Sequence, residues 1–300
     1  MFTKLTDTTK GAIFAVLVLS LAVGAALLIR FLNFSTDLLM FSVWSCTPTV
    51  ATLIMLLVVT RDGYTKEGWK SLGLHRLGLS VWWIAFGLTL LITVAASAVV
   101  WATPLASFTW PEGGILDPLI LFLLLFGMTV LWFGLAEEIG MRGYLQPRLM
   151  SLGRTRALFW VGLVFATWHM PLIFLAPAQV NFPTGNLLLF FPLFYGTFIA
   201  ASFFFGYMRI YTGSIWPASI AHAVHNAAWS VLGAFTLIMV SPVVVNVYLV
   251  GDFGLLIFIG AALGAIWVSH RFKRGMDEAQ SNQEAPIVAP VHPSAPATPR

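Results

Sequence analysis

The chain has few charged residues and a single cysteine. Lys, Arg, Asp and Glu make up 9% of its 300 residues, whereas about 25% of the residues in a typical soluble domain are charged. The lone Cys46 excludes an internal disulfide framework and a zinc site built from cysteines. Hydrophobic residues account for 59% of the chain. This composition indicates one polytopic membrane domain, and the formal charge of +4 requires no nucleic-acid partner.

Long apolar runs are the main feature that the chain does have. A helix needs about 20 apolar residues to cross a bilayer. The runs therefore predict an all-α polytopic membrane protein, with about eight transmembrane helices around a membrane-embedded polar cavity. The spans are predicted at residues 11–31, 38–60, 79–102, 116–137, 155–175, 187–208, 213–235 and 252–270. The fourth is expected to continue as helix to about residue 150. The apolar segment 236–251 fits a connector, a partly re-entrant segment or part of a neighbouring helix.

The basic residues orient these spans, because Lys and Arg favour cytoplasmic loops. With a cytoplasmic N-terminus and about eight spans, all 16 lysines and arginines except Arg30 fall on the cytoplasmic side. Both termini are therefore predicted to be cytoplasmic, and the first span is expected to remain as an anchor. Residues 1–275 are predicted to form a single transmembrane domain. Residues 276–300, which are rich in proline and poor in apolar residues, are predicted to form a disordered cytoplasmic tail.

The stretch "LAEEIGMRGYLQPRL" at the end of the fourth span carries ionisable residues. Such a residue inside a span costs about 2.5–3.5 kcal/mol on insertion scales, so it usually has a partner and a function. Glu138 and Arg142 lie one helical turn apart and are predicted to pair. Glu137 points elsewhere on the helix and is left without a counter-charge, which suits a general base. An interfacial ion pair beside a second glutamate explains the same residues without catalysis.

Two further spans carry polar residues, in "FATWHMP" and "GSIWPASIAHAVHNAAW". His222 and Asn226 share one face of a predicted helix, and His169 lies in the fifth span. Each of these, taken alone, is equally well explained by hydrogen bonds between packed helices, which is the interpretation we prefer for His225. Together with Glu137 they can activate a water molecule: the carboxylate takes the proton, a histidine orients the water or donates to the leaving group, and the asparagine donates to an oxyanion. One glutamate and two histidines also make a possible catalytic zinc set.

Three motifs occur in order within residues 135–230: E-E-x-x-x-R, F-x-x-x-H and H-x-x-x-N. This set resembles the CPBP family, which contains the type II CAAX prenyl endopeptidases and the bacterial Abi proteins linked to bacteriocin processing and self-immunity. The resemblance implies an intramembrane endopeptidase in the cytoplasmic membrane of a prokaryote, with an active site that opens toward the cytoplasm. Its partners would be the lipid bilayer and a membrane-associated peptide substrate, prenylated or leader-type. A non-catalytic scaffold, a bacteriocin self-immunity protein and a transporter are the alternatives.

The resemblance also implies roles for the residues of the motifs. Glu137 would be the base that activates water, with His169 as its partner. His222 and Asn226 would stabilise the oxyanion, and Glu138 and Arg142 would be the supporting ion pair. We expect a glutamate-type mechanism without a metal cofactor. If zinc is required, its ligands would be Glu137, His169 and His222.

Counting residues along the predicted helices places His169 deeper in the membrane than Glu137. We therefore expect the fourth helix to be tilted or to start later than its predicted boundary, or the fifth helix to begin on the cytoplasmic side at Arg154.

Overall fold

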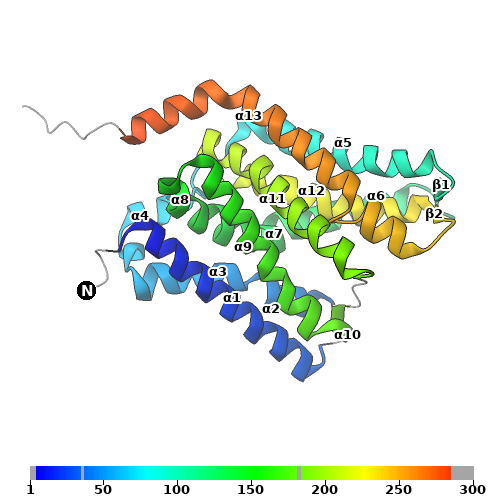
Figure 1. Cartoon of the computed structure of the whole chain (residues 1–300), viewed down its shortest axis with the longest axis horizontal. Helices are drawn as coiled ribbons and strands as arrows, with labels where there is room; N and C mark the ends of the chain where they lie inside the picture. The colour runs from blue at the N-terminus through cyan, green and yellow to red at the C-terminus, as the bar shows by residue number, and fades with distance from the viewer. Residues whose placement is uncertain (1–4, 35–36, 181–183, 285–300) are drawn as a thin grey trace, which may run out of the picture.

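The structure is a computed structural model that describes residues 5–34, 37–180 and 184–284. Figure 1 shows a bundle of helices with two short strands at one end. The α-helices are α1 Asp7–Leu32, α2 Asp37–Ser45, α3 Thr47–Ile54, α4 Lys66–Lys70, α5 Trp82–Trp101, α6 Leu116–Met128, α7 Gly134–Glu138, α8 Gln146–Leu149, α9 Arg154–Leu175, α10 Pro177–Val180, α11 Leu187–Thr212, α12 Trp216–Leu232 and α13 Leu255–Glu284. The fold is that of an all-α polytopic membrane protein, as the apolar runs predict.

Shorter elements join and interrupt these helices. Four are π-helical: η1 Met55–Val59, η4 Thr129–Phe133, η5 Ile139–Leu145 and η8 Val244–Leu249. Four are 3-10 helices: η2 Asp62–Tyr64, η3 Leu79–Val81, η6 Met150–Leu152 and η7 Gly233–Phe235. The two strands are β1 Ala106–Phe108 and β2 Thr236–Ile238, which pair antiparallel with Ala106 opposite Ile238. Segment 236–251 thus contains β2 and η8 and connects α12 to α13.

Within the described residues, seven helical stretches are long and apolar enough to cross a membrane. The predicted span 213–235 is shorter than expected, because α12 has only 17 residues. Gly213 ends α11 in a left-handed conformation with φ of 65°, and α12 begins only at Trp216. The start of α1 and the described end of α13 lie at the same end of the bundle (Figure 1). An even number of passes is therefore needed, so α12 also passes through the bundle.

The second and fourth spans depart from regular helix in ways that shape the site. The second span breaks at Cys46, where α2 ends and α3 begins with Pro48 in its first turn. Proline lacks a backbone N–H and fits only the first turn of a helix without cost. The fourth span is helical from Leu116 to Leu152, as predicted, but π-helical turns flank α7 on both sides. Such turns widen the helix and often occur at functional sites.

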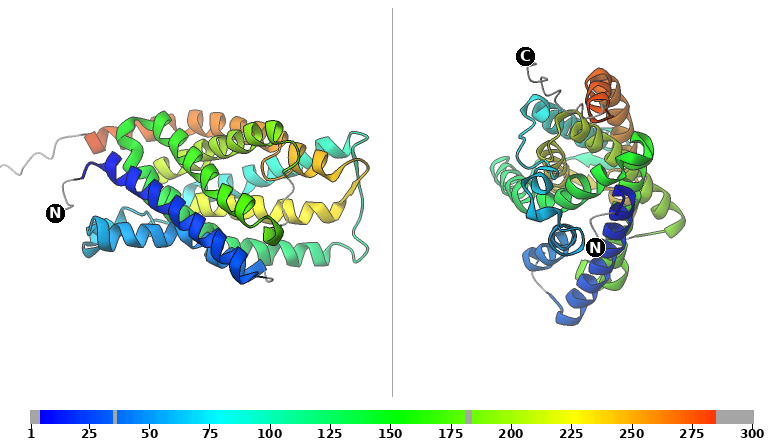
Figure 2. Two further views of the ribbon diagram at one scale, coloured as in Figure 1. Left: turned by 60° about the horizontal axis from the view of Figure 1, so that its bottom comes forward. Right: turned by 90° about the vertical axis from the view of Figure 1, so that its left-hand side faces the viewer.

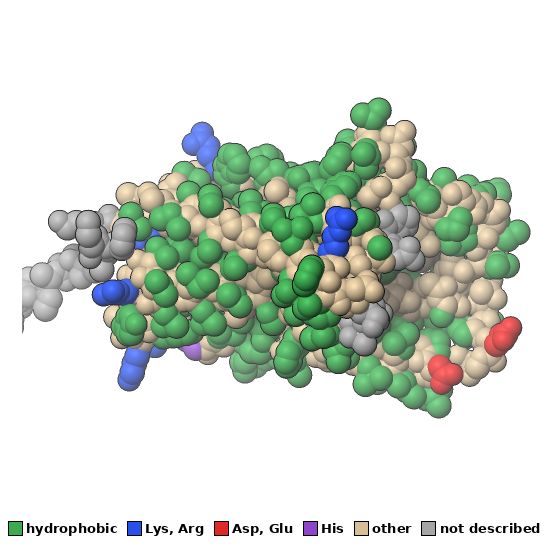
Figure 3. All heavy atoms as spheres, turned by 90° about the horizontal axis from the view of Figure 1, so that it is seen from below, with side chains coloured by type: hydrophobic (Ala, Val, Ile, Leu, Met, Phe, Trp, Pro, Cys, Tyr) green, Lys and Arg blue, Asp and Glu red, His purple; other side chains and the backbone are tan. Residues whose placement is uncertain are grey.

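The helices pack into a bundle with α1 and α13 on opposite sides of it (Figures 1 and 2). Helix α12 lies between them and contacts α5, α6, α7 and α11. On the face that Figure 3 shows, hydrophobic side chains cover much of the surface, most of the visible Lys and Arg side chains lie near the end where the chain starts, and the visible Asp and Glu side chains lie near the other end.

The C-terminal region differs from the prediction in one respect. Helix α13 continues to Glu284, past residue 276, where the sequence predicts that a disordered tail begins. Residues 276–284 include Met, Glu, Ala and Gln, which favour helix, and they extend a helix that is already formed. The rest of the predicted tail, residues 285–300, lies outside the described part of the chain.

Candidate active site

The two adjacent glutamates of α7 are buried at the centre of the site. Glu138 is fully buried and Glu137 is 6% exposed. Neighbouring residues on a helix point in directions about 100° apart, so the two carboxylates meet different partners. Glu138 contacts residues of α12 and η5, whereas Glu137 contacts the break between α2 and α3.

Glu138 forms the ion pair with Arg142 that the spacing predicts. Nη1 of Arg142 lies 3.0 Å from Oε1 of Glu138, and both side chains are fully buried. The guanidinium also lies over the ring of Phe165, with Cζ 4.9 Å from the ring centroid. The predicted pair is thus confirmed. It places a neutralised pair of charges, rather than a bare carboxylate, directly beside Glu137.

His222 lies between the two glutamates. Its Nδ1 atom is 3.1 Å from Oε1 of Glu138, and its Nε2 atom is 3.8 Å from Oε2 of Glu137. The carboxylate of Glu138 is paired with a guanidinium and can only accept, so Nδ1 of His222 carries the proton that is donated. In the neutral ring the Nε2 atom then holds a lone pair that faces Glu137. Both atoms can then accept a hydrogen bond from the same proton donor.

Glu137 has one hydrogen-bonded oxygen and one that is not bonded. Its Oε1 accepts a hydrogen bond of 2.8 Å from Oγ of Ser45. Its Oε2 is buried and has no hydrogen-bond partner among the described residues. Sequence analysis missed Ser45. The signal was present in "WSCTPT", a short polar stretch with a proline inside an apolar span, which is typical of a helix break.

His169 lies near His222. In the part of the chain that the structure describes, it makes no hydrogen bond to Glu137. Its Nδ1 atom is 2.9 Å from the backbone oxygen of Phe165, one turn earlier in α9. The ring of Phe165 stands next to both histidines, with centroid distances of 5.2 Å to His169 and 6.2 Å to His222. The structure therefore gives His222, not His169, the position closest to Glu137. Helix α9 begins at Arg154, directly after Gly153. A start at Arg154 is one of the alternatives that we expected from the difference in depth between His169 and Glu137.

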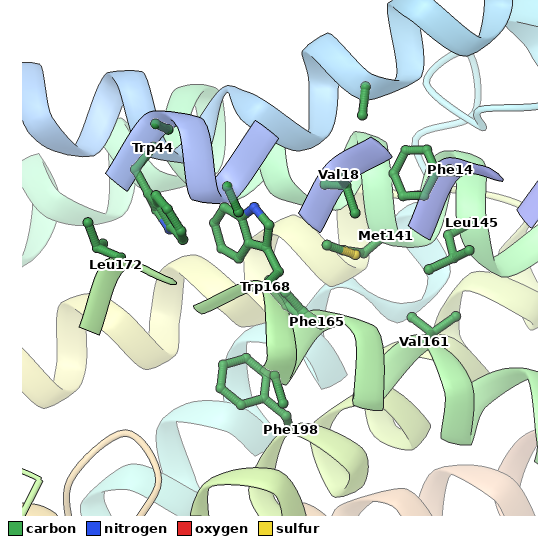
Figure 4. Packing of buried hydrophobic residues seen from close by; sticks show 14 of the residues in the cluster. Phe14, Val18, Trp44, Met141, Leu145, Val161, Phe165, Trp168, Leu172 and Phe198 are labelled. Atoms are coloured by element: carbon green, nitrogen blue, oxygen red, sulfur yellow. The ribbon is translucent and has the colours of Figure 1, made fainter. Parts of the chain in front are cut away.

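A row of aromatic rings supports this arrangement (Figure 4). Trp168 packs between Trp44 of α2 and Phe165, with centroid distances of 4.6 Å and 5.8 Å. Phe165 in turn contacts Phe198 of α11 at 5.0 Å. Because these rings come from three helices, they fix the depth of α9 against both the second and the sixth span.

Asn226 and His225 lie one turn along α12 from His222. In the part of the chain that the structure describes, the side-chain amide of Asn226 makes no hydrogen bond, and its side chain is partly exposed. Nε2 of His225 is 3.1 Å from Oδ1 of Asp252, in the turn before α13. His225 thus joins two segments of the bundle, which is the structural role that we prefer for it.

The residues predicted as possible zinc ligands do not form a metal site in this structure. Among the residues that the structure describes, no group of three or more His, Cys, Asp or Glu side chains is placed to hold a metal. Nδ1 of His222 faces Glu138, and Nδ1 of His169 faces a carbonyl of its own helix. These contacts engage Nδ1 of each histidine, so only the Nε2 atoms are left as ring nitrogens that could bind a metal.

Comparison with known proteins identifies the class of the protein. Residues 117–228 match the family model described as Rce1-like, type II CAAX prenyl endopeptidase. No curated protein matches the chain. The matched segment is similar to the type II CAAX prenyl endopeptidases, and this match supports membership of the CPBP family. The matched segment spans the candidate site from Glu137 to Asn226.

Proposed function

We propose that this protein is an intramembrane endopeptidase that hydrolyses a peptide bond with a water molecule activated by Glu137, without a metal. The observation that carries the proposal is the unequal pairing of the two glutamates. Glu138 is neutralised by Arg142 at 3.0 Å. Among the described residues, Glu137 has no Lys or Arg ion-pair partner, and its Oε2 has no hydrogen bond and lies 3.8 Å from Nε2 of His222. A carboxylate with a free, buried oxygen beside a histidine has the geometry of a general base.

The reaction would use the groups as follows. A water molecule hydrogen-bonded to Oε2 of Glu137 and to Nε2 of His222 gives a proton to Glu137. The oxygen of this water attacks the carbonyl carbon of the peptide bond. The amide of Asn226 donates to the oxyanion that forms. When the carbon–nitrogen bond breaks, the proton on Glu137 passes to the leaving amine. His169 is proposed to orient the water or to donate to the leaving group, and Glu138 holds His222 in one tautomer.

The proposed substrate is a membrane-associated peptide, either prenylated or leader-type. We propose that the substrate enters from the cytoplasmic side of a prokaryotic membrane and that both termini lie there. Two observations support this orientation. Both ends of the described chain lie at one end of the bundle (Figure 1), and most of the Lys and Arg side chains visible in Figure 3 lie near that end.

A direct cleavage assay tests the proposed function. Purified protein in lipid vesicles would be incubated with internally quenched peptides that differ only in whether a C-terminal cysteine is prenylated, and products would be identified by mass spectrometry. We expect the wild-type protein to cleave one bond and Glu137→Gln to cleave none. If the folded wild-type protein cleaves no peptide of a broad library, the protein is instead a scaffold or a self-immunity protein that retains the motifs.

A further inference from the structure

The break in the second span places hydroxyl groups against both helices of the proposed site. Oγ of Ser45 donates to Oε1 of Glu137 at 2.8 Å. Oγ1 of Thr49 donates to the backbone oxygen of Ala136 at 2.7 Å. Nε1 of Trp168, the neighbour of His169, donates to Oγ1 of Thr47 at 2.9 Å. None of these hydroxyl groups belongs to the motifs, yet together they join the end of α2 and the start of α3 to α7 and α9.

Close contact between backbones fixes this segment in place. A Cβ atom added at Gly140 would overlap Cβ of Pro48 and would lie 3.0 Å from its carbonyl carbon. Only glycine therefore allows η5 to lie so close to the first turn of α3. Since Ser45 comes just before that turn, its distance from Glu137 is set by the backbone rather than by a flexible side chain.

The hydrogen bond from Ser45 fixes the rotation of the Glu137 carboxylate. Ser45 is 3% exposed, so water does not compete strongly for this bond. The terminal torsion of a glutamate is broad when nothing holds it. Because Oε1 is bound to Ser45, Oε2 is the oxygen that faces Nε2 of His222.

We propose that Ser45 is a positioning residue for the general base. It directs Oε2 of Glu137 toward His222 and keeps Oε1 out of the reaction. This inference rests on the proposed function, because it assumes that Glu137 takes the proton from water. Ser45 itself does not touch the substrate and forms no covalent bond.

Ser45→Ala is the first test. It leaves the Glu137 carboxylate in place but free to rotate, so we expect kcat to fall about 10- to 100-fold, since small errors in the placement of a catalytic group are costly. KM for a quenched peptide that the wild-type protein cleaves should stay within about twofold, because the substrate contacts are unchanged. Ser45→Thr keeps the hydroxyl group and should restore most of kcat.

Thr49→Val is the matched control. It removes a hydrogen bond of similar length between the second span and α7 but leaves the Glu137 carboxylate bound to Ser45. It should lower the melting temperature in detergent by about as much as Ser45→Ala, while kcat stays within about threefold of wild type. If Thr49→Val lowers kcat as much as Ser45→Ala, the segment acts through stability alone and the proposal is wrong.

Three other outcomes contradict the proposal in different ways. Wild-type kcat in Ser45→Ala, together with an inactive Glu137→Gln, removes the role of Ser45 but leaves the proposed function intact. Full activity in Glu137→Gln removes the proposed function itself. If a fluorophosphonate probe labels Ser45 and neither the alanine nor the threonine variant turns over, Ser45 is a nucleophile instead of a positioning residue.

Discussion

Nδ1 of His222 lies 3.1 Å from Oε1 of Glu138, the same oxygen that accepts a hydrogen bond from Arg142 at 3.0 Å. One carboxylate thus neutralises a buried arginine and fixes the tautomer of a buried histidine. The other carboxylate, on Glu137, has an oxygen, Oε2, that makes no hydrogen bond among the described residues. The two adjacent glutamates thus differ in their partners, and this difference leads to the following predictions.

The first prediction concerns the general base. In the native protein, Ser45 donates a hydrogen bond of 2.8 Å to Glu137. The glutamine of Glu137→Gln has the same size and can still accept this bond, but it cannot take a proton. We expect turnover to fall about 10²- to 10⁴-fold with an almost unchanged melting temperature. Cleavage of a quenched peptide and thermal unfolding in detergent measure the two effects. Near-normal turnover in this variant would rule out Glu137 as the base.

The second prediction concerns the buried ion pair. Arg142→Ala leaves the carboxylate of Glu138 buried without its partner, and such a loss costs about 3–5 kcal/mol. We expect a marked fall in melting temperature together with loss of activity. Arg148→Ala is the control, since it breaks ion pairs with Asp7 and Asp62 whose side chains are 50% and 26% exposed and should cost about 1 kcal/mol or less. Unchanged melting with lost activity in Arg142→Ala would instead place Arg142 in the chemistry.

The third prediction separates the polar residues of α12. His222→Ala and Asn226→Ala should each abolish cleavage. His225→Ala should be milder, because its ring faces Asp252 at 3.1 Å rather than the glutamates. Asp252→Asn should have about the same effect as His225→Ala, and the double variant should add little to either. A greater loss of turnover in His225→Ala than in the other two would show that the wrong face of α12 has been assigned.

The fourth prediction concerns a metal. The proposed mechanism needs none, so activity should survive exhaustive treatment with a strong chelator, and elemental analysis of active protein should find no stoichiometric zinc. Zinc catalysis usually requires three protein ligands and an open position. Loss of activity on chelation, with recovery on adding zinc alone, would recast Glu137 as a ligand and overturn the glutamate mechanism.

The fifth prediction tests the close contact behind the site. Gly140→Ala introduces a Cβ atom that overlaps Pro48, and the overlap is with backbone as well as with the ring. The two helices must separate, so we expect a loss of about 1–3 kcal/mol in stability and a fall in kcat as Ser45 moves from Glu137. Gly127→Ala, in the same span with no atom within 4 Å of the added Cβ, is the control. Equal stability of the two variants would show that the contact with Pro48 is not needed.

Local patterns account for much of what the sequence predicted correctly. The apolar runs identify the membrane helices because lipid requires about 20 consecutive apolar residues in a span. The ion pair between Glu138 and Arg142 follows from one helical turn of spacing. The length of α12 was overestimated, since apolar residues on either side of a helix do not show where Gly213 ends one helix and Trp216 begins the next.

The sequence by itself determined the membrane class, the order of the spans and which polar residues are candidates for the site, because these depend on composition and on spacing along one helix. Only the tertiary structure decided which residues meet. His222 binds Glu138 from another helix, Ser45 binds Glu137 across 92 positions of sequence, and His169 faces its own helix. Such contacts depend on how closely helices approach and at what depth. Those distances are set by small residues such as Gly140 and by packed rings such as Trp168, whose effect appears only when the helices are assembled.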